Sequence, residues 1–330
     1  MPESIAPLSI LTCESGRPFA ESVARELGQQ LVPTTETWFA CGEGKLVIDA
    51  NIRGCDAYVF QSCVGGHDDL SVYDRFIMLL HAVEAAKLSD AFFVTAVLPY
   101  YPASRQDKRK GRTREGISAG LFARMLSAAG AHRVLTVEIH NEAIGGMFDA
   151  SQTTLESIYL TKHVVKWMKK RGIGGDVVVA PDVGGMERAR RFAERLSADL
   201  AALSKERDYS QPNAVLRSTL IGQVADRDVL LVDDIIDTAG SVVAAVDELK
   251  HHGAADITVA CAHPLLSGGA WQSLSELVER ADQEGWRFRM IGTTSVAHES
   301  TPEWYHAYPI EPLISKVITK INSRGSVTEI

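Results

Sequence analysis

Short apolar runs that alternate with amphipathic stretches constrain the fold of this chain more than any other feature of its sequence. The runs are rich in β-branched residues and cover 57–62, 91–100, 133–140, 176–182, 228–234 and 256–264. Between them, apolar residues recur at helical spacing in 118–130, 186–196 and 241–253. This alternation predicts an α/β fold, in which a mostly parallel sheet is flanked by helices on both faces.

Several of the predicted strands end in polar residues. Ser62, His140 and Asp182 close three of them, and Asp233 and Asp234 close a fourth. In open α/β sheets, ligands bind beyond the carboxyl ends of the strands. We therefore expect a ligand site at this edge of the sheet.

Length and charge narrow the class of protein. A chain of 330 residues exceeds the usual size of a single hydrophobic core, so we expect two domains that meet near residues 150–160. The formal net charge of −8 argues against a general binder of nucleic acid or of anionic membranes. The five cysteines form no C-x-x-C pair, and no apolar run approaches the ~20 residues needed to span a bilayer. We expect a cytoplasmic protein without disulfides or a zinc site.

The stretch 229–241, VLLVDDIIDTAGS, carries the strongest chemical signal. Its small residues and hydroxyls allow backbone N–H groups to surround a phosphate at the start of a helix. Asp233 and Asp234 would then accept hydrogen bonds from sugar hydroxyls, directly or through a divalent ion. A helix start capped by Thr238 or Ser241 is the simpler alternative, and the spacing alone leaves it open.

This stretch resembles the phosphoribosyl-pyrophosphate binding signature of type I phosphoribosyltransferases. Its DDIIDTAG form is more particularly similar to that of the ribose-phosphate diphosphokinase family, also called phosphoribosyl pyrophosphate synthetases. Further stretches resemble the same family in order and approximate spacing, namely 51–62, 99–118, 137–149, 177–196 and 263–270. The similarity runs from about residue 36 to the C-terminus.

The resemblance implies two type I phosphoribosyltransferase-like domains, 1–155 and 156–315, of which the second carries a ribose-5-phosphate loop. Residues 316–330 are expected to join the first domain, with GSVTEI as an extra strand. The implied reaction moves the β,γ-diphosphoryl group of ATP onto the anomeric hydroxyl of ribose 5-phosphate. Its products are 5-phosphoribosyl 1-diphosphate and AMP, and its implied cofactor is Mg²⁺.

For ribose 5-phosphate, the resemblance implies that the paired carboxylates hold the sugar hydroxyls and that the following loop holds the 5-phosphate. These residues are Asp233, Asp234, Asp237, Thr238, Ala239, Gly240 and Ser241. The catalytic roles fall to Lys205, which would stabilise the transferring diphosphoryl group, and to Arg207, which would contact substrate. Taken alone, 202–208 would be a surface turn after a short strand. Glu206 stands where the family commonly has a basic residue.

For ATP, the resemblance implies contacts from Phe39, Glu43, Arg105, Gln106 and His140. Phe39 would stack on the adenine, although the residues alone suggest a hairpin turn with a packed aromatic ring. Cys41 replaces the usual aspartate of this loop, which bears on nucleotide preference. The basic stretch 104–116 would lie over the site, where positive charge stabilises a transferring phosphoryl group; a solvated surface loop is the alternative.

For the metal, the resemblance implies His140 and Asp182. On the residues alone, a histidine at a strand end is more often structural, and Asp182 before two glycines suggests an Asx-capped turn. Asn141 and the residues after it depart from the commoner family pattern. The stretch 62–74 is longer than the family norm, and we expect it to be a surface excursion.

The family also implies self-association into a hexamer built from dimers, and regulation by phosphate and ADP at a site that draws on the C-terminal stretch. Ser326 and Thr328 retain both hydroxyl positions of that stretch. Two rival functions remain open at this point. One is a non-catalytic regulatory homologue or nucleotide sensor, and the other is an ordinary phosphoribosyltransferase that consumes the activated sugar.

Overall fold

The structure is a computed structural model that describes residues 4–65, 69–111, 113–207, 215–328 and 330. The chain forms two compact units. The first contains residues 1–158, 294–297 and 309–330, and the second contains 159–293 and 298–308. The predicted domain boundary, after residue 155, falls close to this division. The chain thus returns to the first unit after it has built the second.

The first unit is built on a parallel sheet with the strand order β1-β4-β5-β6-β7. The strands are β1 (Leu8–Thr12), β4 (Asp56–Phe60), β5 (Phe93–Val97), β6 (Arg133–Val137) and β7 (Thr154–Ile158). Successive side chains of a strand point to opposite faces, so each strand contributes to two cores. Buried runs such as ILT in β1 and DAYVF in β4 follow from burial on both faces.

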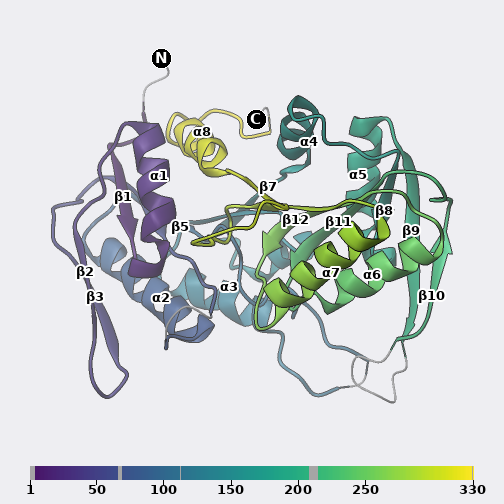
Figure 1. The fold of residues 1–330 in the computed structure, drawn as a ribbon. Helices are drawn as coiled ribbons and strands as arrows, with labels where there is room; N and C mark the ends of the chain where they lie inside the picture. The colour runs from purple at the N-terminus through teal and green to yellow at the C-terminus, as the bar shows by residue number, and fades with distance from the viewer. Residues whose placement is uncertain (1–3, 66–68, 112, 208–214, 329) are drawn as a thin grey trace. The chain divides into compact units, whose positions relative to one another are not determined.

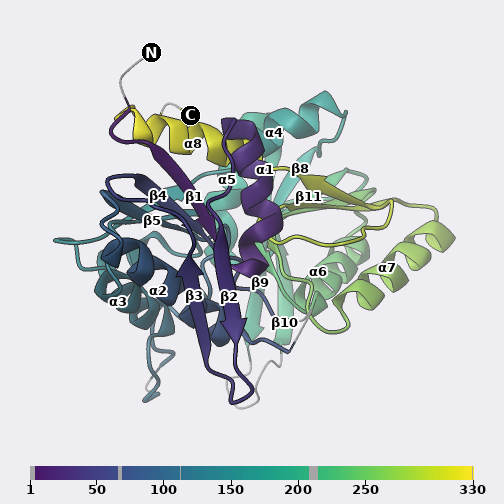
Figure 2. The same cartoon turned by 90° about the vertical axis from the view of Figure 1, so that its left-hand side faces the viewer.

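Helices cover both faces of this sheet (Figure 1). On one face, α2 (Val72–Leu88) and α3 (Ser118–Ala128) pack with Leu11 and Val59 in a single core. The opposite face carries α1 (Arg17–Leu27), whose Phe19 lies 6.2 Å from the Phe60 ring, and α8 (Glu311–Asn322) packs beside α1. An antiparallel hairpin, β2 (Thr34–Trp38) and β3 (Gly44–Ile48), extends along α2 (Figure 2).

The second unit is built on a seven-stranded sheet with the order β10-β9-β8-β11-β12-β13-β14. Its strands are β8 (Val177–Ala180), β9 (Asp199–Arg207), β10 (Val215–Ile221), β11 (Val229–Ile236), β12 (Ile257–Pro264), β13 (Phe288–Thr293) and β14 (Tyr305–Tyr308). Only β10 runs antiparallel to its neighbour among the described pairs. Helices α6 (Gly240–His251) and α7 (Ala270–Glu284) share one buried core with the strands. Helices α4 (Thr161–Lys170) and α5 (Met186–Leu196) pack against each other.

The α/β prediction is confirmed, and each strand and helix predicted from the alternating pattern between 57 and 264 overlaps an element of the same type. Gly130 and Gly253, which follow α3 and α6, have positive φ angles of 97° and 80°, as a glycine beyond a helix end commonly does. No helix among the described residues is both long and apolar enough to cross a membrane.

Two local predictions are wrong. The last residues form no strand in the part that is described, 323–328 and 330, although 309–330 do belong to the first unit, mainly as helix α8. The stretch 202–207 is not a turn, since β9 continues through Arg207, and residue 208 lies outside the described residues. In the predicted surface excursion 62–74, Asp69, Ser71 and Tyr73 are exposed, and Ser71 opens α2 with a capping box to Asp74. Residues 66–68 also lie outside the described residues.

Candidate functional site

The strand order of the second unit changes direction between β8 and β11, which is where open α/β sheets bind ligands. From β8 the chain moves outward through α5 to β9, and from β11 it moves the other way through α6 to β12. The register pairs Val179 with Leu231 and Ala180 with Ala202. The residues that follow these pairs therefore emerge at one edge of the sheet. They include Asp182 and the carboxylate pair in β11.

The carboxylate pair lies near the end of β11. Asp234 is 5% exposed, and its backbone N–H donates to Oδ1 of Asp233 at 2.8 Å. Burial, followed by the neighbouring charge of Asp234, raises the pKa of the Asp233 carboxyl to about 7. Two adjacent carboxylates of this kind are costly in the absence of a ligand. A cation, or the hydroxyl groups of a sugar, would relieve that cost.

Arg188 of α5 reaches this pair, and the sequence analysis missed it. Its Nη2 lies 3.5 Å from Oδ2 of Asp234, and the two side chains are 13% and 8% exposed. The guanidinium also lowers the pKa of Asp233, although less than burial and Asp234 raise it. In the sequence, Arg188 can be recognised only as an arginine in the first turn of the helix that follows Asp182. Only the pairing of β8 with β11 shows that this turn faces the carboxylates.

The loop after the carboxylates has the backbone of an anion site. Ala239 adopts the left-handed conformation, with φ of 62°, and stands directly before α6. It is 3% exposed, while Thr238, Gly240 and Ser241 are exposed. No side chain caps α6, so the alternative of a helix start capped by Thr238 or Ser241 is wrong. The hydroxyls and N–H groups at this helix start suit an anionic oxygen.

Asp182 follows β8 and the predicted catalytic residues belong to β9, the two strands on one side of this loop in the sheet order. Asp182 accepts a hydrogen bond from Gly185 N–H at 3.0 Å and caps a 3₁₀ turn, as the residues alone suggest. Lys205 and Arg207 belong to β9, where Lys205 pairs with Ser218 of β10. The structure gives the backbone of these two residues and not their side chains. Their catalytic roles therefore stay predictions.

In the first unit, a second set of predicted residues comes together beyond β5 and β6. His140 and Arg105 are exposed. Gln106 accepts a hydrogen bond from Ser118 at the start of α3, at 2.7 Å. The next residue, Asp107, is 6% exposed and accepts a hydrogen bond from the side chain of Asn141. Asn141, a departure from the family pattern, thus ties the His140 segment to the Arg105–Gln106 segment.

The basic stretch after Asp107 is organised around one carboxylate. Glu115 Oε1 accepts hydrogen bonds from Lys110 N–H and from the Thr113 hydroxyl, and its carbonyl accepts one from Arg109 Nε. These bonds lower the pKa of Glu115. The basic residues that the structure describes here are all exposed, namely Arg105, Lys108, Arg109, Lys110 and Arg114.

The turn of the β2–β3 hairpin presents the predicted adenine-binding residues. Phe39 is 47% exposed, so the packed ring expected from the residues alone is wrong; Lys45 Nζ lies 5.7 Å from the ring centroid. Phe39 N–H donates to the carbonyl of Glu43 at 2.8 Å, which closes the turn. Cys41 and the Glu43 side chain are exposed. An exposed aromatic face of this kind can stack on a planar base.

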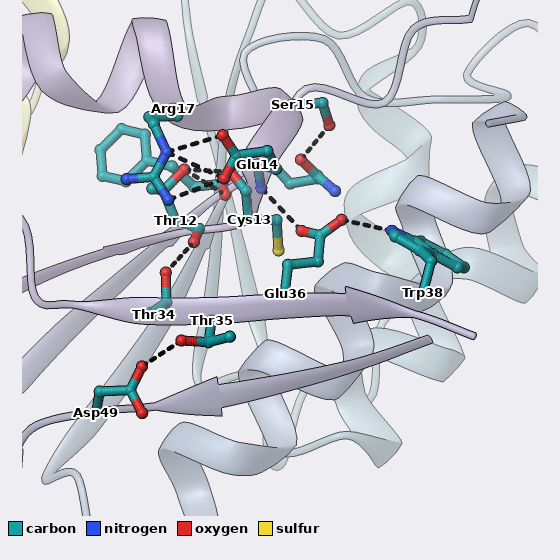
Figure 3. Close-up of polar contacts among 12 residues, drawn as sticks. Thr12, Cys13, Glu14, Ser15, Arg17, Thr34, Thr35, Glu36, Trp38 and Asp49 are labelled. Atoms are coloured by element: carbon teal, nitrogen blue, oxygen red, sulfur yellow. Dashed lines mark hydrogen bonds and ion pairs between the residues drawn. The ribbon is translucent and has the colours of Figure 1, made fainter. Parts of the chain in front are cut away.

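Glu36 anchors this hairpin to the rest of the first unit (Figure 3). Its Oε2 accepts from Glu14 N–H just beyond β1, and its Oε1 accepts from Trp38 Nε1, each at 2.8 Å. The Thr34 hydroxyl adds a bond to the carbonyl of Thr12 at 2.9 Å. The carboxylate therefore fixes the strand that leads into the Phe39 turn.

Among the described residues, no three His, Cys, Asp or Glu side chains lie close enough to form a metal site of their own. The second unit presents a carboxylate pair and an uncapped helix start, which suit the hydroxyls and the phosphate of a phosphorylated sugar.

Comparisons with known proteins agree with this chemistry. Residues 8–130 match the family model described as the N-terminal domain of ribose phosphate pyrophosphokinase, and residues 152–282 match the phosphoribosyl transferase domain. The chain is 34% identical over 327 residues to a ribose-phosphate pyrophosphokinase of Listeria ivanovii, covering 98% of this chain and 96% of the relative. It is 33% identical over 323 residues to that of Corynebacterium ammoniagenes, covering 97% and 96%.

A solved structure, the phosphoribosylpyrophosphate synthetase of Mycobacterium smegmatis, matches with a TM-score of 0.84 at 31% identity and covers 97% of this chain and 100% of that one. The two domains define the class, an enzyme of the phosphoribosyltransferase fold. The near full-length relatives then define the family. The chain belongs to the ribose-phosphate pyrophosphokinases.

Arg188 provides a first test of the second unit. Because its guanidinium stabilises the ionised carboxylate pair, Arg188→Gln should raise the apparent KM for ribose 5-phosphate about tenfold at neutral pH, which corresponds to about 1.4 kcal/mol. Use of ribose 5-phosphate declines on acidification as the carboxylates take up protons. The pH of this decline should move upward in the variant, because loss of the guanidinium raises the pKa of the carboxylates. Arg188→Lys should restore part of both effects. Steady-state kinetics from pH 6 to pH 9 measure them.

Arg190→Gln is the matched control for this test, because Arg190 lies on the same helix and pairs with Glu187 and Glu194 at the surface. It should behave as the wild type does. An unchanged pH profile in Arg188→Gln would show that Arg188 has no influence on the carboxylates.

Glu36 provides a test of the hairpin. Glu36→Ala removes the anchoring bond from Glu14 N–H and the bond from Trp38 within the hairpin, so the apparent KM for ATP should rise several-fold while that for ribose 5-phosphate stays constant. Thr35→Ala breaks only the exposed bond to Asp49 within the hairpin and should leave both constants unchanged (Figure 3). Equal changes in the two constants would count against a nucleotide role for the hairpin.

Proposed function

We propose that this chain transfers the β,γ-diphosphoryl group of ATP to the anomeric hydroxyl of ribose 5-phosphate, giving 5-phosphoribosyl 1-diphosphate and AMP. One observation carries the proposal. The buried carboxylate pair is followed by an uncapped small-residue helix start where the strand order of the second unit changes direction. A sugar phosphate matches both parts, since its hydroxyls suit the carboxylates and its phosphate suits the helix start.

The ribose end of the reaction rests on the second unit. Asp233 and Asp234 accept hydrogen bonds from the 2- and 3-hydroxyls, and Arg188 favours the ionised form of the pair. Residues 237–241 hold the 5-phosphate through backbone N–H groups and the hydroxyls of Thr238 and Ser241. With both ends of the sugar fixed, the anomeric hydroxyl is oriented toward the β-phosphorus. Positioning of this kind supplies much of the rate in phosphoryl transfer.

The transfer itself needs positive charge where negative charge develops. We assign this role to Lys205, with Arg207 and Arg105 as further contacts to the phosphate chain. Phe39 stacks on the adenine, and Glu43, Gln106 and His140 supply polar contacts to the nucleotide. The anomeric oxygen forms a bond to the β-phosphorus as the bond from that phosphorus to the α,β-bridging oxygen breaks; AMP leaves as an anion, and the proton of the anomeric hydroxyl passes to solvent.

We propose Mg²⁺ as the metal, with His140 and Asp182 as its protein-side contacts. When bound, the ion would neutralise phosphate charge and orient the chain of phosphates. Asp182 is held in place by its bond to Gly185 N–H, so one carboxylate is presented at the sheet edge in a fixed orientation. Because Mg²⁺ commonly takes one or two carboxylates plus substrate phosphates, affinity for the metal should depend on bound ATP.

The deciding experiment incubates the purified chain with Mg-ATP and ribose 5-phosphate and follows AMP. AMP that forms only when the sugar is present supports the proposal. Nucleotide binding without AMP would identify a non-catalytic homologue. Consumption of 5-phosphoribosyl 1-diphosphate with a free base would instead identify an ordinary phosphoribosyltransferase.

We also propose that the enzyme acts in the cytoplasm, where both phosphorylated substrates occur, and that it self-associates into a hexamer built from dimers. Phosphate and ADP are the proposed effectors. The C-terminal stretch has two hydroxyls side by side for such an anion, because Ser326 Oγ and Thr328 Oγ1 lie 2.7 Å apart.

A further inference from the structure

The second unit carries a groove whose lining is almost wholly cationic. Helix α4 supplies four exposed lysines, and α5 supplies Arg195; together with Val165 these residues line a shallow groove of about 500 Å³ that is open to solvent. The lysines are Lys162, Lys166, Lys169 and Lys170. No carboxylate is among the lining residues, all of which are described. This charge is concentrated in a protein whose formal net charge is −8.

The spacing of the lysines places them on one side of α4. Residues at i, i+4, i+7 and i+8 share a helix face, which is the pattern that 162, 166, 169 and 170 follow. Lys169 Nζ donates to the carbonyl oxygen of Arg195 at 2.7 Å, which positions the ammonium group without cancelling its charge. The neighbouring Glu194 lies 3.5 Å from Arg190.

Helix stabilisation does not explain this face. Lys169 and Lys170 lie in the last turn, where cations complement the helix dipole, but Lys162 lies in the first turn, where a cation is unfavourable. The pairs Lys162–Lys166 and Lys166–Lys170 are like charges four residues apart, and each such pair destabilises a helix by about 0.2–0.5 kcal/mol. A bound anion would convert these repulsions into attractions.

We propose that this groove, which we call the α4–α5 groove, binds a linear inorganic oligophosphate of three or more phosphate units. The ten residues of α4 span about 15 Å, so the lysines can contact several phosphates in succession. The lining contains no aromatic side chain on which a base could stack, which disfavours a nucleotide or a single-stranded nucleic acid. Val165 alone offers little apolar anchorage for an acidic peptide.

The test is a calorimetric titration of the full chain with tripolyphosphate. α,β-Methylene-ATP is kept at saturation, because it fills the catalytic nucleotide site and cannot be cleaved between its α- and β-phosphates. The groove variant is Lys166→Gln/Lys169→Gln. The matched control is Lys87→Gln/Lys316→Gln, which removes two exposed lysines from helices of the first unit.

We expect the wild type and the control to bind one tripolyphosphate per chain in the groove, and the groove variant to bind it at least tenfold more weakly. Increasing salt should weaken binding steeply in the wild type and less so in the groove variant. AMP formation should be the same in all three proteins, so the outcome is independent of the proposed catalytic activity. Equal binding by the groove variant and the wild type would overturn the proposal, as would tighter binding of a polyglutamate peptide or an oligonucleotide.

Discussion

Replacing Lys205 with alanine should lower turnover by ~10² or more while ribose 5-phosphate binding stays nearly intact. The reason is that a cation which acts on the transferring diphosphoryl group stabilises the transition state more than either bound substrate. Its position on β9, adjacent to β8 in the sheet, places its backbone at the edge where the carboxylates lie. Single-turnover AMP formation and equilibrium binding of the sugar phosphate measure the two quantities.

Thr219→Ala on the paired strand β10 is the control, because it changes an exposed residue of the same pair of strands. It should retain wild-type turnover. If Lys205→Ala also turned over at the wild-type rate, Lys205 would have no part in the mechanism.

Asp233→Asn should abolish efficient use of ribose 5-phosphate and at the same time stabilise the ligand-free protein. A neutral amide binds sugar hydroxyls less strongly than a carboxylate, so the apparent KM should rise at least about tenfold. The amide oxygen can still accept from Asp234 N–H, which keeps the local geometry. Relief of the repulsion between the two carboxylates should add about 1 kcal/mol or more above pH 7, or roughly 2–4 °C in Tm.

The sign of the pH dependence follows from the raised pKa of Asp233. The folded state holds a proton that the unfolded state releases above about pH 4, so stability is lost as the pH rises from about 4 to about 7. The gain in Tm for Asp233→Asn should therefore be largest at pH 8 and shrink toward pH 4.5. Thermal unfolding at these pH values measures it, and a gain that grows on acidification would contradict the assignment.

The parallel sheets could be predicted because strands that are buried on both faces appear in the sequence as continuous apolar runs. Runs such as VLLV of β11 and VVVA of β8 are apolar without alternation. The secondary-structure prediction failed where the local residue pattern and the pairing between strands favour different structures. The Lys205 stretch is polar and suggests a turn, yet pairing with β10 keeps it in a strand beyond the last pair with β8 at Ala202.

Much of the site could be proposed from motifs, but its supporting contacts could not. Arg188 meets Asp234 across a strand-to-strand register, and Asp107 meets Asn141 from another loop. Neither pair has a local sequence signature, because each contact depends on how separate segments are brought together. The roles implied for Lys205, Arg207 and His140 rest on family resemblance and await the experiments above.

The return of α8 to the first unit has a consequence for synthesis on the ribosome. Asn322, the last residue of α8, donates to the carbonyl of Ala6 at 3.0 Å and to Asp56 Oδ2 at 2.9 Å, and its carbonyl accepts from Ile5 N–H at 2.7 Å. Ile5 and Ala6 can make these bonds only after residue 322 has been synthesised. The second unit ends at residue 308, so all its residues are synthesised before those that complete the first unit.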